Sequence, residues 1–167
     1  MASAIREAPC FHDLSLSAQL LVWATRHWML AHRQRRMISV CVPRSFAEAG
    51  LLNAYTVLCD LLSILVFREY SPGDFSSTNA PQLSAHELRL FEFLLAVNRD
   101  DEDAPELLPG NTPPAVARQL VAKAGILIEL LRREGHRLVV PVLFNDATSY
   151  RDPTSLPETG RLCRPLC

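Results

Sequence analysis

The sequence is poor in lysine and glycine, and both shortages limit the chemistry that the chain can perform. Lys123 is the only lysine among 17 Lys and Arg residues, and the 167 residues include only six glycines. So few glycines leave little material for a phosphate-binding loop, and the sequence has no Gly-x-Ser-x-Gly or His-Glu-x-x-His motif. No motif therefore nominates a catalytic residue, although an enzyme whose site is assembled from distant residues stays open.

Strong net charge and long hydrophobic runs are missing as well. The formal net charge of -1 gives no overall attraction to nucleic acid or to an anionic membrane. The longest hydrophobic stretch, 51–67, is interrupted by Asp60 and is shorter than the ~20 apolar residues that span a bilayer. Residues 1–14 contain no hydrophobic region typical of secretion signals. We therefore expect a cytoplasmic protein that neither inserts into a membrane nor binds nucleic acid.

The cysteines lack the paired spacing of a disulfide framework or a zinc site. Their number is odd and their intervals are irregular: Cys10, Cys41, Cys59, Cys163 and Cys167. Structural zinc sites usually have closely spaced ligand pairs in both halves, and no such pair occurs here. We expect free thiols, no metal and no cofactor. The sequence leaves open whether Cys10, Cys41, Cys163 and Cys167 meet in space.

The chain does contain enough apolar residues for the core of one domain. Hydrophobic residues make up 49% of the sequence and charged residues 21%, which excludes wholesale disorder. A domain of this length buries about 70% of the surface that the unfolded chain exposes. We predict an all-α fold, a single-domain bundle of four main helices over 1–144, followed by a loosely ordered tail over 145–167.

The first two predicted helices begin at serines. Ser15 or Ser17 caps the first, whose apolar periodicity runs to Arg36. Ser45 and Glu48 form a capping box that opens the second helix, predicted over 45–66. Because that helix is apolar around most of its circumference, we expect it at the centre of the bundle. The residues before it, 38–42, are predicted to be a linker.

The other two helices have clear start and stop signals. Ser84 and Glu87 form a second capping box, and this helix reaches Asn98. An acidic connection follows over 99–111. Thr112 is predicted to cap the last helix, with Pro113 in its first position and Gly135 at its end. Gly125 within this helix would allow close contact with another helix, and 138–144 is predicted to be an extended segment or edge strand.

The opening of the chain resembles a group of small helical bacterial proteins. The shared pattern is Leu-Ser, Gln-Leu-Leu, Trp-Ala, Arg and Trp over 14–28, followed by the helix start over 83–90. The resemblance implies a helical fold and a bacterial origin. It carries over no functional residue, because the matched positions are mostly core leucines and helix caps.

Residues of the kind that bind ligands are densest late in the first predicted helix. These candidates are Trp23, Arg26, His27, Trp28, Arg33, Arg35 and Arg36. Arginine binds anions and aromatic rings provide stacking area, so this face could bind phosphate, a membrane surface or an acidic partner. The alternative is that Trp23 and His27 pack in the core while the arginines are solvated and complement the helix dipole. Asp60 is expected in an ion pair or at the edge of an apolar stripe, with a general acid or base as the alternative.

These patterns favour a non-enzymatic protein-interaction, adaptor or regulatory protein. Four helices with broad apolar stripes leave apolar area outside one small core, and a homodimer or another protein partner would cover it. The seam of such a dimer is predicted at Trp28, Val121 and Ile128. Two alternatives stay open, namely a nucleic-acid-binding regulator that uses the face from Arg26 to Arg36, and an enzyme or ligand sensor with a dispersed site.

Overall fold

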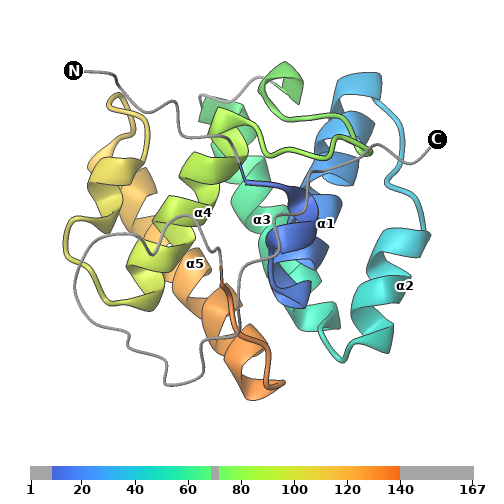
Figure 1. The fold of residues 1–167 in the computed structure, drawn as a ribbon. Coiled ribbons are helices and arrows are strands. Elements are labelled where there is room, and N and C mark those ends of the chain that lie inside the picture. Colours follow the sequence, from blue (N-terminus) through green and yellow to red (C-terminus); the bar gives the residue numbers. More distant parts are fainter. Residues whose placement is uncertain (1–8, 69–71, 140–167) are drawn as a thin grey trace, which may run out of the picture.

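Helices form the whole framework of the computed structural model, which describes residues 9–68 and 72–139 (Figure 1). Its α-helices are α1 (Leu16–Gln34), α2 (Cys41–Glu48), α3 (Leu52–Arg68), α4 (Ala85–Asn98) and α5 (Pro114–Arg133). Short 3-10 turns precede α1 and follow α3 and α4, namely η1 (Phe11–Asp13), η2 (Pro72–Asp74) and η3 (Ala104–Leu107). The prediction of an all-α fold with four main helices is confirmed, since α2 is much shorter than the others.

The helix α3 occupies the centre of the bundle. It contacts α1, α2 and α5, and Figure 1 shows it between α1 and α5. Leu58, Leu61 and Leu62 on α3 are fully buried. The fourth long helix, α4, packs against α5. No helix in the described part of the chain is both long enough and apolar enough to cross a membrane.

The single helix predicted over 45–66 is wrong, because the chain turns at Gly50 and divides it into α2 and α3. Gly50 has a φ of +73°, a left-handed conformation that glycine adopts without a steric penalty. The backbone N–H of Leu51 donates to the carbonyl of Phe46 at 2.7 Å, and that of Gly50 donates to Ala47 at 3.0 Å. This is the hydrogen-bond pattern of a Schellman motif, and its two flanking apolar side chains, Phe46 and Leu51, are both buried.

The start of α2 also differs from the prediction. The helix begins at Cys41, so the linker predicted over 38–42 ends two residues early. Ser45 and Glu48 lie in the second half of α2 and therefore do not form a capping box. Pro43 fits because it occupies the first turn of α2, where its missing N–H removes no intrahelical hydrogen bond.

Most other helix ends follow their sequence signals. Ser15 caps α1, and its hydroxyl accepts a hydrogen bond from the backbone of Ala18 at 3.4 Å. At α5 the cap is Pro113 rather than Thr112, so the helix begins one residue later than predicted. Gly135 ends α5 with a φ of +75°, as expected, and His136 donates back to the Leu131 carbonyl at 2.9 Å.

Two extended segments return to the ends of helices. Cys10 and Gln82 form an isolated antiparallel bridge, which ties the N-terminal segment to the connection before α4. After α5 the chain returns to α1, where the hydroxyl of Ser17 donates to the Arg137 carbonyl at 2.7 Å. The predicted extended segment at 138–144 thus begins against α1. Its residues 140–144, and the tail predicted over 145–167, lie outside the described residues.

Candidate functional site

Arg26, predicted to belong to an exposed binding face, forms a buried ion pair with Glu87. Its Nε donates to Oε1 of Glu87 at 2.7 Å and its Nη2 donates to Oε2 at 3.0 Å. Both side chains are only 1% exposed. The geometry is bidentate, the arrangement in which the planar guanidinium matches a carboxylate best.

The remaining contacts of Arg26 are also internal. Nη1 donates to the Ala80 carbonyl at 2.6 Å, and Nη2 donates to the Gln82 carbonyl at 2.8 Å. The ring of Phe11 lies 5.7 Å from the guanidinium carbon, within the range of a cation–π interaction. Arg26 therefore joins α1 to α4, to the connection before it and to the N-terminal segment, and its guanidinium is not available to an external ligand.

Glu87 has a second role at the start of α4. Its Oε2 accepts the backbone N–H of Ser84 at 2.8 Å, while the Ser84 hydroxyl accepts the backbone N–H of Glu87 at 3.2 Å. The predicted capping box is confirmed. No local pattern predicts that the same carboxylate pairs with Arg26, because the two residues are 61 positions apart.

The aromatic residues of α1 are paired with histidines one turn further along. Trp23 contacts His27 edge-on, with ring centroids 4.9 Å apart, and Trp28 stacks on His32 at 5.2 Å. Both tryptophans are half-buried and pack against the core. Partial burial lowers the pKa of His27, because desolvation disfavours its charged form. Trp23, His27 and Trp28 are therefore partly covered, whereas His32 is exposed.

The last arginines of α1 form the exposed part of the predicted binding group. Arg33, Arg35 and Arg36 are solvent-exposed and make no side-chain hydrogen bond or ion pair with any residue in 9–68 or 72–139. Arg35 ends α1 with a φ of +51°, a left-handed conformation that is unfavourable for a residue with a Cβ. Beside them Met37 is 95% exposed. We call Arg33, Arg35 and Arg36 the arginine cluster.

The predicted dimer seam is not brought together. Ile128 is 5% exposed, so the expectation that it lies on an outer stripe is wrong. Val121 is half-buried on α5, and Trp28 lies half-buried on α1. The exposed large apolar residue of α5 is Ile126, with 51% of its surface accessible.

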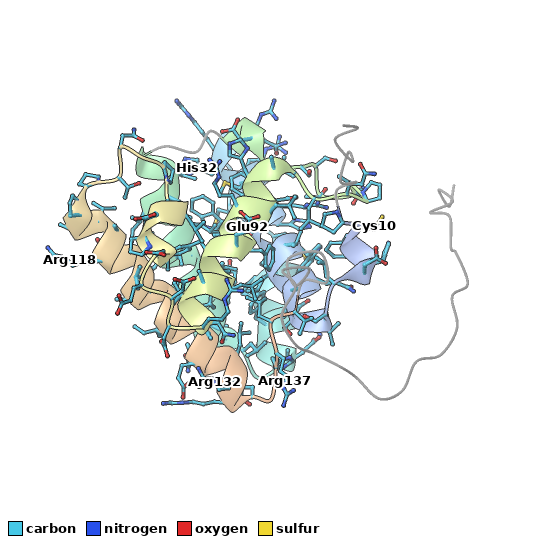
Figure 2. The ribbon with its side chains drawn as sticks, turned by 60° about the vertical axis from the view of Figure 1, so that its left-hand side comes forward. Cys10, His32, Glu92, Arg118, Arg132 and Arg137 are labelled. Carbon is cyan, nitrogen blue, oxygen red and sulfur yellow. The ribbon has the colours of Figure 1, made fainter. Side chains whose placement is uncertain are left out.

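The outer face of α5 is hollowed along its length. One open hollow of about 450 Å³ is lined by Pro105, Pro114, Ala117, Arg118, Val121 and Ala122. A second, of about 380 Å³, is lined by Ala122, Gly125, Ile126, Glu129, Leu130 and Arg133. The two hollows share Ala122, so they form one strip, which we call the α5 groove. In Figure 2, α5 lies at one side of the molecule, and Arg118 and Arg132 project near its opposite ends.

Cys59 and Asp60 are adjacent polar residues on α3. Asp60 is exposed and pairs with Lys123 of α5, with 2.5 Å between Oδ2 and Nζ, which confirms the expectation of an ion pair. Burial raises the pKa of the neighbouring Cys59 thiol, so less of the nucleophilic thiolate is present at neutral pH. Cys41 is also a free thiol, whereas Cys163 and Cys167 lie outside the described residues. Within the described ranges, no three His, Cys, Asp or Glu side chains gather as metal ligands would.

Comparison with protein-family models, with curated proteins and with solved structures finds no match for this chain. The likeness of residues 14–28 to a group of bacterial proteins therefore stays an expectation from the sequence. Evidence about function comes from the surface of the molecule, above all from the α5 groove and the arginine cluster.

Proposed function

We propose that this chain is a non-enzymatic interaction protein of the bacterial cytoplasm and that the α5 groove receives a protein partner. The observation that carries the proposal is the pair of adjoining hollows on α5, lined mostly by apolar residues, beside which Ile126 is half-exposed. Contiguous apolar surface on a water-soluble domain is typical of an interaction site.

The groove also has the composition of a protein interface. Its lining consists mostly of small and apolar residues, with Arg118, Glu129 and Arg133 among them. Protein interfaces combine an apolar centre with a polar rim in this way. Glu129, the acidic residue of this lining, pairs with Arg132 and Arg133 of its own helix, so what the groove offers a partner is mainly shape and apolar area.

Photo-crosslinking from single positions tests this proposal. Benzoylphenylalanine replaces Ile126 in one variant and Leu52 of α3 in a matched control, since the two side chains are 51% and 49% exposed. After irradiation in bacterial cells, we expect position 126 to give a discrete crosslinked protein species, identified by mass spectrometry, and position 52 to give none. Equal crosslinking from both positions, or none from position 126, would contradict the proposal.

The arginine cluster favours a second candidate function, binding of nucleic acid. Its three guanidinium groups are exposed and have no partner among the described residues, so they are free to contact phosphates. The net charge of -1 and the burial of Arg26 count against it. We expect no salt-sensitive retention of the wild type on DNA or RNA. Retention at physiological salt that is lost when all three arginines are replaced with Gln would put this function first.

A further inference from the structure

We infer that the partner in the α5 groove is a second copy of this chain, packed antiparallel so that Arg118 of each copy faces Glu129 of the other. This inference rests on the proposed function, because it identifies the protein that the groove receives. Three features of α5 lead to it: the placement of its charges, the size of the side chains between them, and a glycine that nothing within the chain requires.

The charges of the groove are complementary to themselves when the helix is reversed. Arg118 and Glu129 are eleven residues apart, or about 16 Å along the helix, and both line the groove. In an antiparallel pair of α5 helices, each arginine can therefore meet the glutamate of the other copy, and the two-fold axis forms the contact twice. Arg118 has no ion-pair partner among the described residues, whereas Glu129 contacts only Arg132 and Arg133 of its own helix.

The residues between these charges fit the same register. Positions 118, 122, 125 and 129 follow the four- and three-residue steps of a helix–helix seam. With Arg118 opposite Glu129, Ala122 of one copy lies level with Gly125 of the other at the middle of the seam, while Val121 and Ile126 lie on opposite flanks of it. The smallest residues thus meet at the centre, where the helix axes approach most closely, and the larger apolar residues flank them.

Gly125 provides independent support for a close approach from outside. Glycine weakens a helix interior because it loses more backbone entropy on folding than any other residue. Gly50 and Gly135 end helices, and their positive φ explains why they are glycines. Gly125, in contrast, lies within α5. A Cβ added at Gly125 would meet no other atom within 4 Å. Packing within the chain therefore does not require glycine here, and its small size leaves room for the close approach of a second helix.

The charge pattern also favours an antiparallel over a parallel pair of α5 helices. A parallel pair of α5 helices would place Arg118 against Arg118 and Glu129 against Glu129, which is repulsive. A two-fold antiparallel pair converts both contacts into attractions. Closed two-fold dimers are the commonest assemblies of soluble proteins.

Charge reversal on the full-length chain, measured by light scattering, tests the inference. The wild type should have about twice the 18.7 kDa monomer mass at micromolar concentration. Arg118→Glu and Glu129→Arg should each raise the dimer dissociation constant by about tenfold or more, because each creates two contacts between like charges. Arg89→Glu reverses an exposed arginine of α4 outside the groove and should leave the mass of the dimer unchanged.

Mixing the two groove variants gives the most specific result. Each variant supplies the charge that the other has lost, so an equimolar mixture of Arg118→Glu and Glu129→Arg should recover the dimer mass. All substituted side chains are exposed or half-exposed, and circular dichroism of each variant checks that it is folded. A dimer that does not reform in the mixture would overturn the proposed register.

A monomeric wild type would overturn the inference itself. Crosslinking from position 126 then separates the two proposals: crosslinks to a different protein would overturn the second copy while supporting the interaction function. Absence of any crosslink, together with a monomeric wild type, would overturn both. Crosslinks between two copies of this chain support both.

Discussion

Arg26 and Arg33 are the same kind of residue on the same helix, yet their environments are opposite. They are seven residues apart, which at 3.6 residues per turn places them on almost the same side of α1. Arg26 is buried with Glu87, under the connection that contains Ala80 and Gln82. Arg33 is exposed, and no described residue offers it an acceptor. Helical periodicity assigns a residue to a face, but segments far along the chain decide whether that face is covered.

The largest expected effect comes from removing the buried arginine. Arg26→Ala leaves the Glu87 carboxylate buried without a cation, the Ala80 carbonyl without a donor, and the Gln82 carbonyl with only the long hydrogen bond from the Ser76 hydroxyl at 3.4 Å. We expect the free energy of unfolding to fall by about 3–5 kcal/mol. Arg33→Ala should change it by less than about 0.5 kcal/mol. Urea unfolding of both variants, followed by circular dichroism, measures the difference.

A charge-free double variant separates the ion pair from simple packing. Arg26→Met combined with Glu87→Gln removes both charges and keeps an amide that can still cap α4. Because a lone buried charge is costlier than none, the double variant should be more stable than Arg26→Ala. If Arg26→Ala and Arg33→Ala instead lowered the free energy of unfolding equally, the difference between their environments would have no energetic consequence.

The ends of helices were predictable where a local motif was complete. Ser84 and Glu87 supply both hydrogen bonds of a capping box within four residues, and the structure has both. The signal at Gly50 is equally local, but the apolar pattern continues across it and therefore predicts one unbroken helix. Apolar periodicity is judged over many residues, each of which is a weak indicator, whereas one glycine in the left-handed region is enough to end a helix.

The environment of individual side chains was less predictable than the helices. The pairing of Arg26 with Glu87 spans 61 positions and depends on how α1 and α4 pack, which no local pattern contains. Ile128 and Ile126 are two positions apart on α5, and the structure buries the first while it exposes the second. The apolar stripe of α5 was recognisable, but its covered edge depends on where α3 and α4 lie.

Loss of the cap on α4 should have an intermediate effect. Ser84→Ala removes the hydroxyl that accepts the Glu87 backbone N–H, while position 84 keeps the backbone N–H that donates to the Glu87 carboxylate. We expect a loss of about 1 kcal/mol in the free energy of unfolding, since the ion pair with Arg26 remains. The same urea titration measures it. A loss as large as that of Arg26→Ala would mean that the cap, and not the ion pair, fixes Glu87.

A smaller effect, of opposite sign, is expected at the exposed end of α1. Arg35 has a φ of +51°, and its side chain makes no hydrogen bond or ion pair with a described residue. Arg35→Gly removes the steric cost of the left-handed conformation and adds backbone entropy to the unfolded state. We expect a net gain of about 0.5–1 kcal/mol in unfolding free energy. Arg36→Gly is the matched control and should bring no gain, because Arg36 does not have a positive φ. A destabilised Arg35→Gly variant would show that the arginine cluster contributes to the fold.

The smallest effect concerns His27, the neighbour of Arg26 in the sequence. Partial burial lowers its pKa below the ordinary 6.5, so the folded protein binds a proton at His27 less readily than the unfolded chain does. The stability that neutral His27 contributes is therefore complete above pH 6.5 and is lost as the pH falls below that value. His27→Gln removes this titration, so the wild type should lose slightly more stability than the variant between about pH 7.5 and pH 5.5. Urea unfolding at both pH values measures the difference in unfolding free energy between the wild type and the variant. A difference that does not change with pH would place His27, like the arginine cluster, among the solvated residues of α1. A difference that shifts in favour of the wild type at low pH would show that a nearby acceptor stabilises the protonated ring.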